Sequence, residues 1–368
     1  MSKQVQFTNL LQLESLAREL LEPSYFDYIA GGADDELTIR RNREDFERIV
    51  LRPRMLVDVS EVSTSTTVLG TPISLPVMLA PTAGHKMCCP DGEMATARAA
   101  SAMGTVMVLS TLSTTSLEDV ASAAPGPKWF QLYVYKDREV TRTLVQRAEA
   151  AGYRALCVTV DVPLIGNRER DLRNAFTFPY PLPNFAGFEQ AGLEKLPIGV
   201  VNVQSGLGAY IASKWDPSLS WKDIEWFRSI TRLPMVIKGV LTAEDAVLAA
   251  DHGASAVVVS NHGGRQLDSV PSGIAALPEV AEAVGDRLEI YMDGGVRRGT
   301  DVLKALALGA RAVLIGRPYM YALAVGGEEG VRRALEILRQ EISRAMALSG
   351  RPAVSTIDRS LVAYHDRR

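Results

Sequence analysis

Cysteine is scarce in this chain of 368 residues, which contains only Cys88, Cys89 and Cys157. Three cysteines cannot build a disulfide framework, and an adjacent pair lacks the spacing of a zinc site. No cluster of His, Asp and Glu shows metal-ligand spacing elsewhere, so the sequence predicts no bound metal. This cysteine usage is typical of the reducing cytoplasm, where we expect the protein to reside.

Long apolar runs and an excess of one charge sign are also missing. The first residues, Ser2, Lys3 and Gln4, are polar, and no uncharged apolar run reaches the length of about 18 residues that a membrane span needs. We therefore expect a soluble protein without a membrane partner. The net charge of −3 and the absence of a long Lys/Arg cluster argue against a nucleic-acid partner.

What the chain has in quantity is an alternation of apolar strands and amphipathic helices. Its 47% hydrophobic residues are enough for a large core. We predict eight strands, at residues 75–80, 105–109, 129–134, 155–160, 234–238, 256–260, 288–292 and 312–315. Helical patterns separate them, for example at residues 137–151, 242–252, 299–308 and 330–348. Eight such units favour an α/β fold of the closed (β/α)8 TIM-barrel type, with ligands at the carboxyl ends of the strands.

Two segments lie outside this alternation. Residues 1–70 predict an N-terminal helical cap, in which Asn9 and Gln12 mark a helix start and residues 36–49 form a further helix. Residues 162–221 form a long, proline-containing loop after the fourth barrel strand, which we interpret as a partly disordered lid. We treat residues 1–368 as a single domain whose barrel spans residues 75–348.

Residues 260–268, Ser-Asn-His-Gly-Gly-Arg-Gln-Leu-Asp, carry the strongest chemical signal. They follow the apolar strand at residues 256–259, so His262 and Arg265 emerge at one strand end. A histidine can accept a proton near neutral pH, and an arginine can hold a carboxylate with its planar fork of donors. The pair suits an acidic substrate that loses a proton or a hydride. Taken alone, His-x-x-Arg is also compatible with an ordinary surface loop.

Glycine and arginine recur after strands seven and eight, in residues 293–299 and 315–318. Glycines expose backbone N–H groups, a helix begins directly behind them, and the arginines add positive charge. Loops after these two strands are the usual phosphate site of this fold. The motif predicts a phosphate-bearing cofactor held by Gly295, Arg297, Gly316 and Arg317. No Gly-x-Gly-x-x-Gly follows a strand, which argues against a dinucleotide.

Small polar residues end the first four strands, and a lysine ends the fifth. Such groups form hydrogen bonds with the heteroatoms of a flat polar ring, although each could instead satisfy local backbone. The polar strand ends are Thr82, Ser110, Gln131, Tyr133, Thr159 and Asp161. Lys238 at a barrel mouth needs an anionic partner, which is either a ligand or a carboxylate of the protein.

Together these motifs, from about residue 7 to about residue 357, resemble the FMN-dependent 2-hydroxy acid oxidase and dehydrogenase family. The resemblance implies that FMN is the cofactor and that Lys238 contacts the flavin edge that becomes anionic on reduction. The cofactor-binding residues that it implies are Thr82, Ala83, Ser110, Gln131, Thr159, Lys238, Ser260, Asp293, Gly295, Arg297, Gly316 and Arg317.

The resemblance also implies the oxidation of a small 2-hydroxy acid. The substrate carboxylate would be held by Tyr28, Arg168 and Arg265, although Tyr28 by its pattern alone would be a core aromatic. His262 would be the general base, and the other catalytic residues would be Asp161, Tyr133 and Lys238.

The electron acceptor and the assembly follow from the same resemblance. Ala83 stands where several members that react slowly with oxygen carry glycine, so we expect O2 as acceptor and hydrogen peroxide as product. The alternatives are a dehydrogenase that uses a quinone or a protein, a barrel that binds FMN without oxidising a hydroxy acid, and a relative that acts on a larger natural product. Members are often homotetramers, which we expect here.

Two departures from the family concern the substrate tail. Leu112 occupies a place where glycolate oxidases carry tryptophan, and Gly84 stands where many members have a large apolar residue. Both changes remove volume, so we expect lactate and larger aliphatic or aryl (S)-2-hydroxy acids to be accepted. His85 either lines this pocket or is a partly exposed loop histidine.

Overall fold

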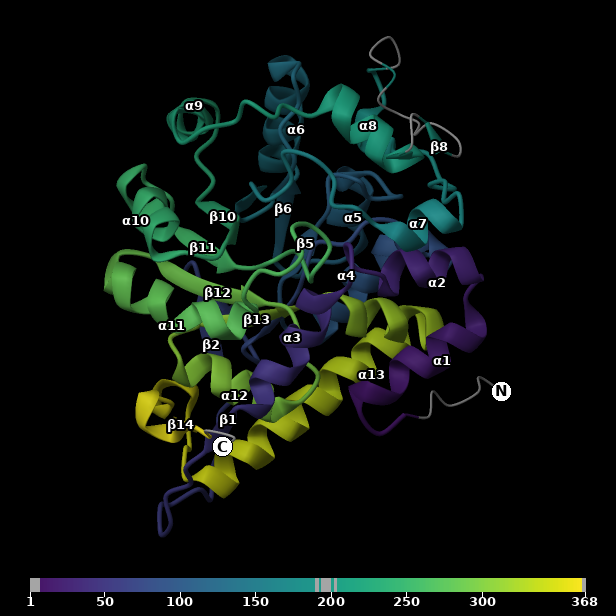
Figure 1. The fold of residues 1–368 in the computed structure, drawn as a ribbon. Helices are drawn as coiled ribbons and strands as arrows, with labels where there is room; N and C mark the ends of the chain where they lie inside the picture. Colours follow the sequence, from purple (N-terminus) through teal and green to yellow (C-terminus); the bar gives the residue numbers. More distant parts are fainter. Residues whose placement is uncertain (1–6, 189–191, 193–199, 202–203, 366–368) are drawn as a thin grey trace.

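Eight parallel strands close into a barrel at the centre of the molecule (Figure 1). The computed structural model describes residues 7–188, 192, 200–201 and 204–365. Around the barrel the strands follow the order β10-β11-β12-β13-β4-β5-β6-β7. In chain order they are β4 (Val77–Leu79), β5 (Met107–Leu109), β6 (Lys128–Leu132), β7 (Leu156–Thr159), β10 (Met235–Val240), β11 (Ala256–Val259), β12 (Glu289–Asp293) and β13 (Ala312–Ile315). All eight predicted strands and the (β/α)8 TIM barrel are confirmed.

Alternate residues of each strand serve two separate hydrophobic clusters. Ala256 and Val258 of β11 point into the barrel, where Trp129 and Tyr291 pack with ring centroids 5.4 Å apart. The intervening residues face the surrounding helices, which is why these strands are apolar on both faces.

A small hairpin closes the amino-terminal end of the barrel. It consists of β2 (Thr66–Val68) and β3 (Thr71–Ile73), and its buried Val68 and Ile73 join the inward-facing cluster. The Glu289 carboxylate accepts hydrogen bonds from the Leu69 amide at 3.0 Å and from the Tyr291 hydroxyl at 2.5 Å. Because this end of the barrel is filled, a ligand can enter the barrel at the carboxyl ends of its strands.

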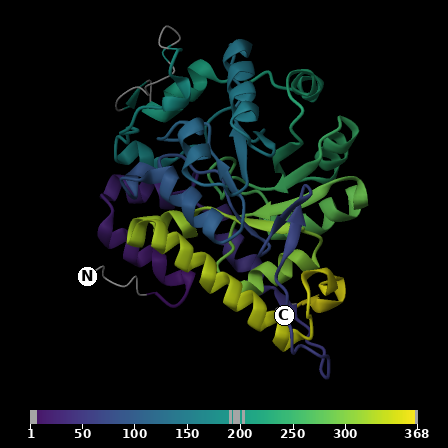
Figure 2. The ribbon, with the colours of Figure 1, turned by 180° about the vertical axis from the view of Figure 1, so that it is seen from behind.

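Helices follow the strands and cover the barrel (Figures 1 and 2). They are α4 (Gly92–Ala102), α5 (Leu117–Ala123), α6 (Arg138–Ala150), α9 (Lys222–Ile230), α10 (Ala243–Asp251), α11 (Gly273–Val284), α12 (Gly299–Ala307) and α13 (Arg317–Ser349). The predicted helix at 330–348 is only the second part of α13, which begins directly after β13. Gly326 and Gly327 have non-helical dihedral angles and divide α13 into two parts.

The N-terminal cap packs beside α13. It contains the 3-10 helix η1 (Leu10–Gln12), α1 (Leu13–Leu20), α2 (Pro23–Ala30) and α3 (Leu37–Glu47). The predicted start at Asn9 is confirmed, because its side chain accepts hydrogen bonds from the amides of Leu11 and Gln12. Further along, β1 (Ile49–Leu51) pairs antiparallel with β14 (Val362–Tyr364), which joins the cap to the C-terminal region.

The segment from 162 to 221 contains more regular structure than the predicted irregular loop. It holds α7 (Glu169–Arg173), β8 (Val200–Val201), β9 (Gln204–Ser205) and α8 (Gly206–Lys214). In Figure 1, α7 lies next to α2 at the right of the barrel, and α8 lies above it at the upper right. The expectation of partial disorder concerns residues outside the described part of this segment. The remaining 3-10 helices are η2 (His85–Met87), η3 (Pro183–Phe185), η5 (Gly285–Arg287), η6 (Val354–Thr356) and η7 (Arg359–Leu361).

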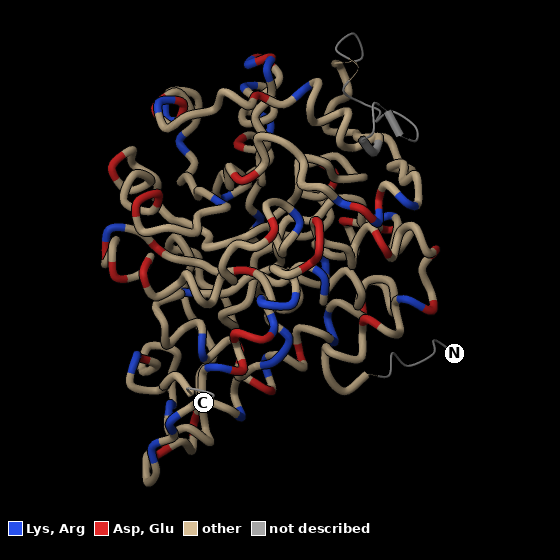
Figure 3. Tube along the Cα trace, in the orientation of Figure 1, with Lys and Arg blue, Asp and Glu red and all other residues tan. Residues whose placement is uncertain are grey.

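Acidic and basic residues are interspersed along the chain trace, and neither sign is confined to one element (Figure 3). Among the helices of the described residues, none combines the length and the apolar character needed to cross a membrane.

Candidate active site

A cavity with an empty volume of about 1130 Å³ lies at the carboxyl ends of the barrel strands. Sixteen of the predicted site residues line it: Tyr28, Thr82, Ala83, Ser110, Leu112, Tyr133, Thr159, Arg168, Lys238, His262, Arg265, Asp293, Gly295, Arg297, Gly316 and Arg317. These residues come from the cap, from the segment 162–221 and from all eight strand ends. The fold therefore brings together groups that are far apart in the sequence.

Four predicted residues do not line this cavity. Asp161 and Ser260 lie behind the cavity wall, where Asp161 contacts His262 and Ser260 accepts a hydrogen bond from Lys238. The Gln131 side chain donates to Thr159 Oγ1 at 3.0 Å and accepts from the Thr111 amide at 3.2 Å, so it supports Thr159 from behind. The fourth is Gly84.

Gly84 does not enlarge the cavity, contrary to the expectation. A Cβ atom there would lie 2.4 Å from Met87 Cε and 3.0 Å from the Phe178 ring, so its neighbours already fill the space. Its φ of 75° explains the glycine instead. Both alternatives for His85 were wrong, because its imidazole is buried and bonds to Thr82 Oγ1 at 2.8 Å and to Thr96 Oγ1 at 3.1 Å.

His262 and Asp161 form a hydrogen-bonded pair. Nδ1 of His262 lies 2.9 Å from Oδ1 of Asp161, and the His262 amide donates to Ser260 Oγ at 3.0 Å. A bulge in β10 places Gly239 against Asp161, where a Cβ atom would come within 2.6 Å of the Asp161 Cβ. With Nδ1 committed to the carboxylate, Nε2 is the ring nitrogen available to a ligand.

The protonation of this pair suits a general base. Burial lowers the pKa of His262 below its usual value, and the attraction of Asp161 offsets this only in part. Burial raises the pKa of the Asp161 carboxyl, but His262 and Lys238 outweigh this and hold it below its usual value. At neutral pH the pair therefore consists of a neutral imidazole beside a carboxylate.

Lys238 has a protein carboxylate as partner, which was one of the two alternatives left open by the sequence. Its Nζ lies 3.1 Å from Asp293 Oδ2 and donates to Ser260 Oγ at 2.9 Å. Burial alone would lower the pKa of Lys238, but Asp293 and Asp161 raise it above its usual value, so the ammonium stays charged. Oδ1 of Asp293 is buried and has no hydrogen-bond partner among the described residues, which indicates a further group at this position.

Arg168 and Arg265 form a positively charged corner beside Tyr28. Arg265 Nη1 donates to the Tyr28 carbonyl at 2.6 Å and its guanidinium lies 5.0 Å from the centre of the Tyr28 ring. Burial and the neighbouring Arg265 lower the pKa of Arg168 to about 10. Within the described residues neither arginine forms an ion pair with a carboxylate. The buried Asp171 attracts both arginines from a distance but forms no ion pair with either. Two neighbouring guanidinium groups without a directly paired carboxylate favour the binding of an anion here.

A second positively charged corner lies at β12 and β13. Arg317 donates to the carbonyls of Ile29, Gly263 and Gly31 at 3.1, 2.8 and 2.9 Å, which leaves two of its five N–H groups for a ligand. Burial and Arg265 lower its pKa to about 10. The Arg297 guanidinium donates only to the carbonyl of Val296 among the described residues, at 3.0 Å, while the Arg297 backbone amide donates to Asp301 Oδ2 at 2.9 Å.

Gly295 of this corner is required by close packing. Its φ is 85°, and a Cβ atom there would lie 1.7 Å from the carbonyl oxygen of Asn42 in α3. Only glycine allows α3 to approach the loop after β12 this closely.

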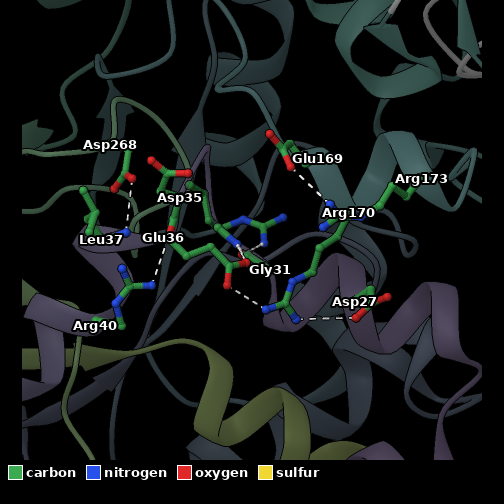
Figure 4. A network of polar contacts seen from close by, with 12 residues as sticks. Asp27, Gly31, Asp35, Glu36, Leu37, Arg40, Glu169, Arg170, Arg173 and Asp268 are labelled. Atoms are coloured by element: carbon green, nitrogen blue, oxygen red, sulfur yellow. Dashed lines mark hydrogen bonds and ion pairs between the residues drawn. The ribbon is translucent and has the colours of Figure 1, made fainter.

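The cap and the segment 162–221 are joined by charged contacts (Figure 4). Arg170 of α7 pairs with Glu36 at 2.7 Å and with Asp27 at 3.5 Å. The Asp268 carboxylate accepts hydrogen bonds from the amides of Leu37 and Thr38 at the start of α3. These contacts fix Tyr28, Arg168 and Arg265, which come from three different segments, around one point of the cavity.

Sequence reasoning missed the apolar wall that α8 contributes. Leu207, Ile211 and Trp215 line the cavity, and Trp215 stacks on Tyr133 with ring centroids 3.8 Å apart and planes inclined by 20°. The three residues are spaced four apart, which is the pattern of one helix face. That spacing could have revealed the wall, but the segment was treated as a loop.

Comparisons with known proteins extend over nearly the whole chain. The family profile described as FMN-dependent dehydrogenase matches residues 17–364. Glycolate oxidase 3 of Arabidopsis thaliana is 52% identical over 358 residues, which cover 97% of this chain and 96% of the relative. Glycolate oxidase of Spinacia oleracea is 51% identical over 361 residues, or 98% and 96% of the two chains. The crystal structure of mandelate oxidase with (S)-4-hydroxymandelic acid matches with a TM-score of 0.92 and 43% identity, over 97% of this chain and 99% of that one.

Proposed function

Because the chain belongs to the FMN-dependent dehydrogenase family, we propose that it oxidises an (S)-2-hydroxy acid to the 2-oxo acid and passes the electrons to O2, giving hydrogen peroxide. One observation carries this proposal. The cavity brings a neutral His262, which is paired with Asp161 at 2.9 Å, next to the positively charged corner of Arg168 and Arg265. A base beside an anion site is what the oxidation of a hydroxy carboxylate requires.

The cavity fits FMN, the cofactor of this family. Its volume of about 1130 Å³ suits a cofactor together with a small substrate. The unpartnered Oδ1 of Asp293 and the partly uncommitted Arg297 indicate a polar ligand that carries an anionic group. We infer that the ring is held by Thr82, Ala83, Ser110, Thr159 and Lys238, with Gln131 and Ser260 behind them, and that the remainder and its phosphate are held by Asp293, Gly295, Arg297, Gly316 and Arg317. FMN supplies the two-electron acceptor.

The residues of the chain bind and orient the substrate. Arg265 and Arg168 hold the carboxylate, and Tyr28, packed against Phe176 with ring centroids 4.4 Å apart, closes this corner. With the carboxylate fixed, the hydroxyl group lies towards His262 and Tyr133. Burial and the neighbouring Asp161 raise the pKa of the Tyr133 hydroxyl, which therefore stays protonated as a hydrogen-bond donor.

Proton removal is the part of the reaction that the protein performs. Nε2 of His262 accepts the proton, and the imidazole becomes positively charged. The Asp161 carboxylate stabilises this charge through its contact with Nδ1. The positive charge of Lys238, held by Asp293, would stabilise negative charge on a bound flavin.

The test is to mix the purified FMN-loaded protein without oxygen against glycolate, both lactates, both mandelates and a longer aliphatic acid, and then to admit air. We expect the S enantiomers to bleach the flavin and air to restore it with release of peroxide. The matched control is His262→Gln, which should keep the flavin and lose the bleaching. Wild-type rates in this variant, or a flavin that no acid bleaches, would contradict the proposal. Bleaching with slow return of colour would indicate a dehydrogenase instead.

A further inference from the structure

A second cavity lies beside the first, next to the carboxyl ends of β6, β7 and β10. Its empty volume is about 1060 Å³, and it shares the wall residues Tyr133, Thr159, Val162 and Trp215 with the first cavity. The rest of its wall is mostly apolar and includes Val134, Val160, Leu219, Trp221, Ile224 and Val240. Of the described residues that line it, the charged ones are Asp216 and Asp245.

Trp215 is the largest of the four shared residues and is held firmly in place. Its backbone forms an antiparallel bridge with Tyr135, and the following amide of Asp216 donates to the carbonyl of Val134 at 2.9 Å. The Asp216 carboxylate pairs with Arg138 at 2.6 Å. The indole is buried and stacks on Tyr133, so it forms a fixed partition between the two cavities.

The polar groups of the active site decide which way a substrate tail extends. Arg168, Arg265 and His262 hold the carboxylate and the hydroxyl group of the proposed substrate. The remaining substituent at its second carbon then faces the apolar wall made by Leu112, Leu207, Ile211 and Trp215. The second cavity begins on the other side of the Trp215 ring.

We propose that Trp215 limits the length of the substrate tail, and that the cavity behind it is a latent subsite for a longer apolar tail. The inference rests on the proposed function and adds the residue that sets its specificity. Among the described residues the lining offers a carboxylate no cation, because Asp216 is already paired with Arg138 and Asp245 is negative, so the tail that fits this subsite is an uncharged alkyl or aryl group.

The decisive variant is Trp215→Ala, tested with (S)-lactate and (S)-2-hydroxyoctanoate. Removing the indole joins the two cavities, so kcat/KM for 2-hydroxyoctanoate relative to lactate should rise by at least about tenfold, the discrimination that a single methylene gives in an apolar pocket. Trp215→Phe, which keeps a ring against Tyr133, should give a smaller rise. An unchanged ratio in both variants would overturn the proposal.

A second substitution tests where the tail lies. Leu219 lines the second cavity but not the first, and Leu219→Trp should fill it. In the double variant Trp215→Ala/Leu219→Trp the gain for 2-hydroxyoctanoate should disappear. A gain that persists would show that the tail lies elsewhere and would overturn the assignment of the subsite.

Binding provides a readout that does not depend on turnover. We would titrate the FMN-loaded proteins with pyruvate and 2-oxooctanoate and follow the flavin absorption spectrum. The Kd for 2-oxooctanoate should fall in Trp215→Ala while that for pyruvate does not, and an unchanged Kd for 2-oxooctanoate would overturn the subsite. Failure of the proposed function itself would be seen separately, as a wild-type protein that oxidises no 2-hydroxy acid.

Discussion

At the scale of single residues, the site depends on charged groups whose partners are limited. His262 has one carboxylate, Asp161, and Lys238 has Asp293. Arg168 and Arg265 share a corner without a carboxylate partner among the described residues. These unequal pairings leave a neutral base beside two arginines that form no direct ion pair, which is the combination that an anionic substrate needs.

The pH dependence of activity follows from the His262 pKa. Only the neutral imidazole can act as a base, and burial lowers its pKa below 6.5, so the neutral form persists to lower pH than for an exposed histidine. We expect kcat/KM for lactate to fall only below pH 6.5. His262→Gln should reduce kcat/KM by about 10²- to 10⁴-fold. Asp161→Asn should lower the maximum value of kcat/KM. It should also move the acidic decline of kcat/KM to still lower pH, because Asp161 raises the pKa of His262. An acid limb above pH 7 in the wild type would contradict this assignment.

Gly295 offers a stability test with a matched control. In Gly295→Ala the new methyl group meets the Asn42 carbonyl in addition to the strained φ of 85°, whereas Gly70, at a φ of 74°, has no atom within 4 Å of a Cβ. Gly70→Ala should therefore cost about 1 kcal/mol for the left-handed backbone alone, and Gly295→Ala clearly more. Thermal unfolding and retention of FMN would be measured for both variants. An equal decrease in thermal stability in the two variants would show that the close approach of α3 to Gly295 does not contribute to stability.

At the scale of elements, the active site depends on how the cap and the segment 162–221 dock on the barrel. Tyr28 is carried by α2, Arg168 immediately precedes α7, and Trp215 immediately follows α8. None of these belongs to the barrel strands. The contacts of Arg170 and Asp268 with the cap therefore have a direct effect on the geometry of the site.

Asp268 is the side chain that caps α3. Burial works against its ionisation, but hydrogen bonds from Thr38, Ser269 and Leu37 lower its pKa to about 2. Asp268→Ala should reduce the free energy of unfolding at pH 7 by about 1 kcal/mol, whereas Asp268→Asn, which keeps an acceptor oxygen, should lose less. Because the folded-state pKa is below the unfolded value of about 3.9, the contribution of ionised Asp268 is complete above that pH and declines as the pH falls towards 2.

Urea unfolding of wild type and Asp268→Ala at a series of pH values would check this. The difference in free energy of unfolding between them should shrink below about pH 4. A difference that grows on acidification would contradict the assigned role of the carboxylate.

At the scale of the whole molecule, apolar side chains are exposed beside the C-terminal end of α13, where the Arg54 amide donates to the Ser349 carbonyl. Met55 and Leu56 have exposed fractions of 68% and 106% and lie in the loop that follows β1. Large exposed apolar residues are often covered in an assembly. The predicted homotetramer would account for them if this loop lies at a subunit contact.

Light scattering after size-exclusion chromatography would test this prediction. We expect the wild type to run as a tetramer and Leu56→Asp to shift the population towards smaller species. Leu20→Asp, which changes a leucine of α1 that is 61% exposed, is the control and should not shift it. A wild-type monomer, or a tetramer unaffected by Leu56→Asp, would contradict the prediction.

The sequence by itself determined the barrel and the chemical identity of its mouth. Both follow from local patterns: apolar runs of strand length that alternate with helices, and polar, glycine and arginine residues directly after the strands. Since the carboxyl ends of all parallel barrel strands meet at one end, His262, Lys238 and Arg317 had to approach one another. The positions of the eight strands and the lining roles of most predicted residues could therefore be inferred from the order of residues alone.

Only the tertiary structure decided which groups pair and how large the pocket is. His262 and Asp161 are 101 residues apart, and Arg265 meets the carbonyl of Tyr28 across 237 residues. Phe178 fills the space beside Gly84, and Trp215 adds a wall that the loop pattern did not reveal. These contacts depend on the docking of the cap and the segment 162–221 onto the closed barrel. No local periodicity encodes such long-range packing, which is why the shape of the substrate pocket could not be predicted from the sequence.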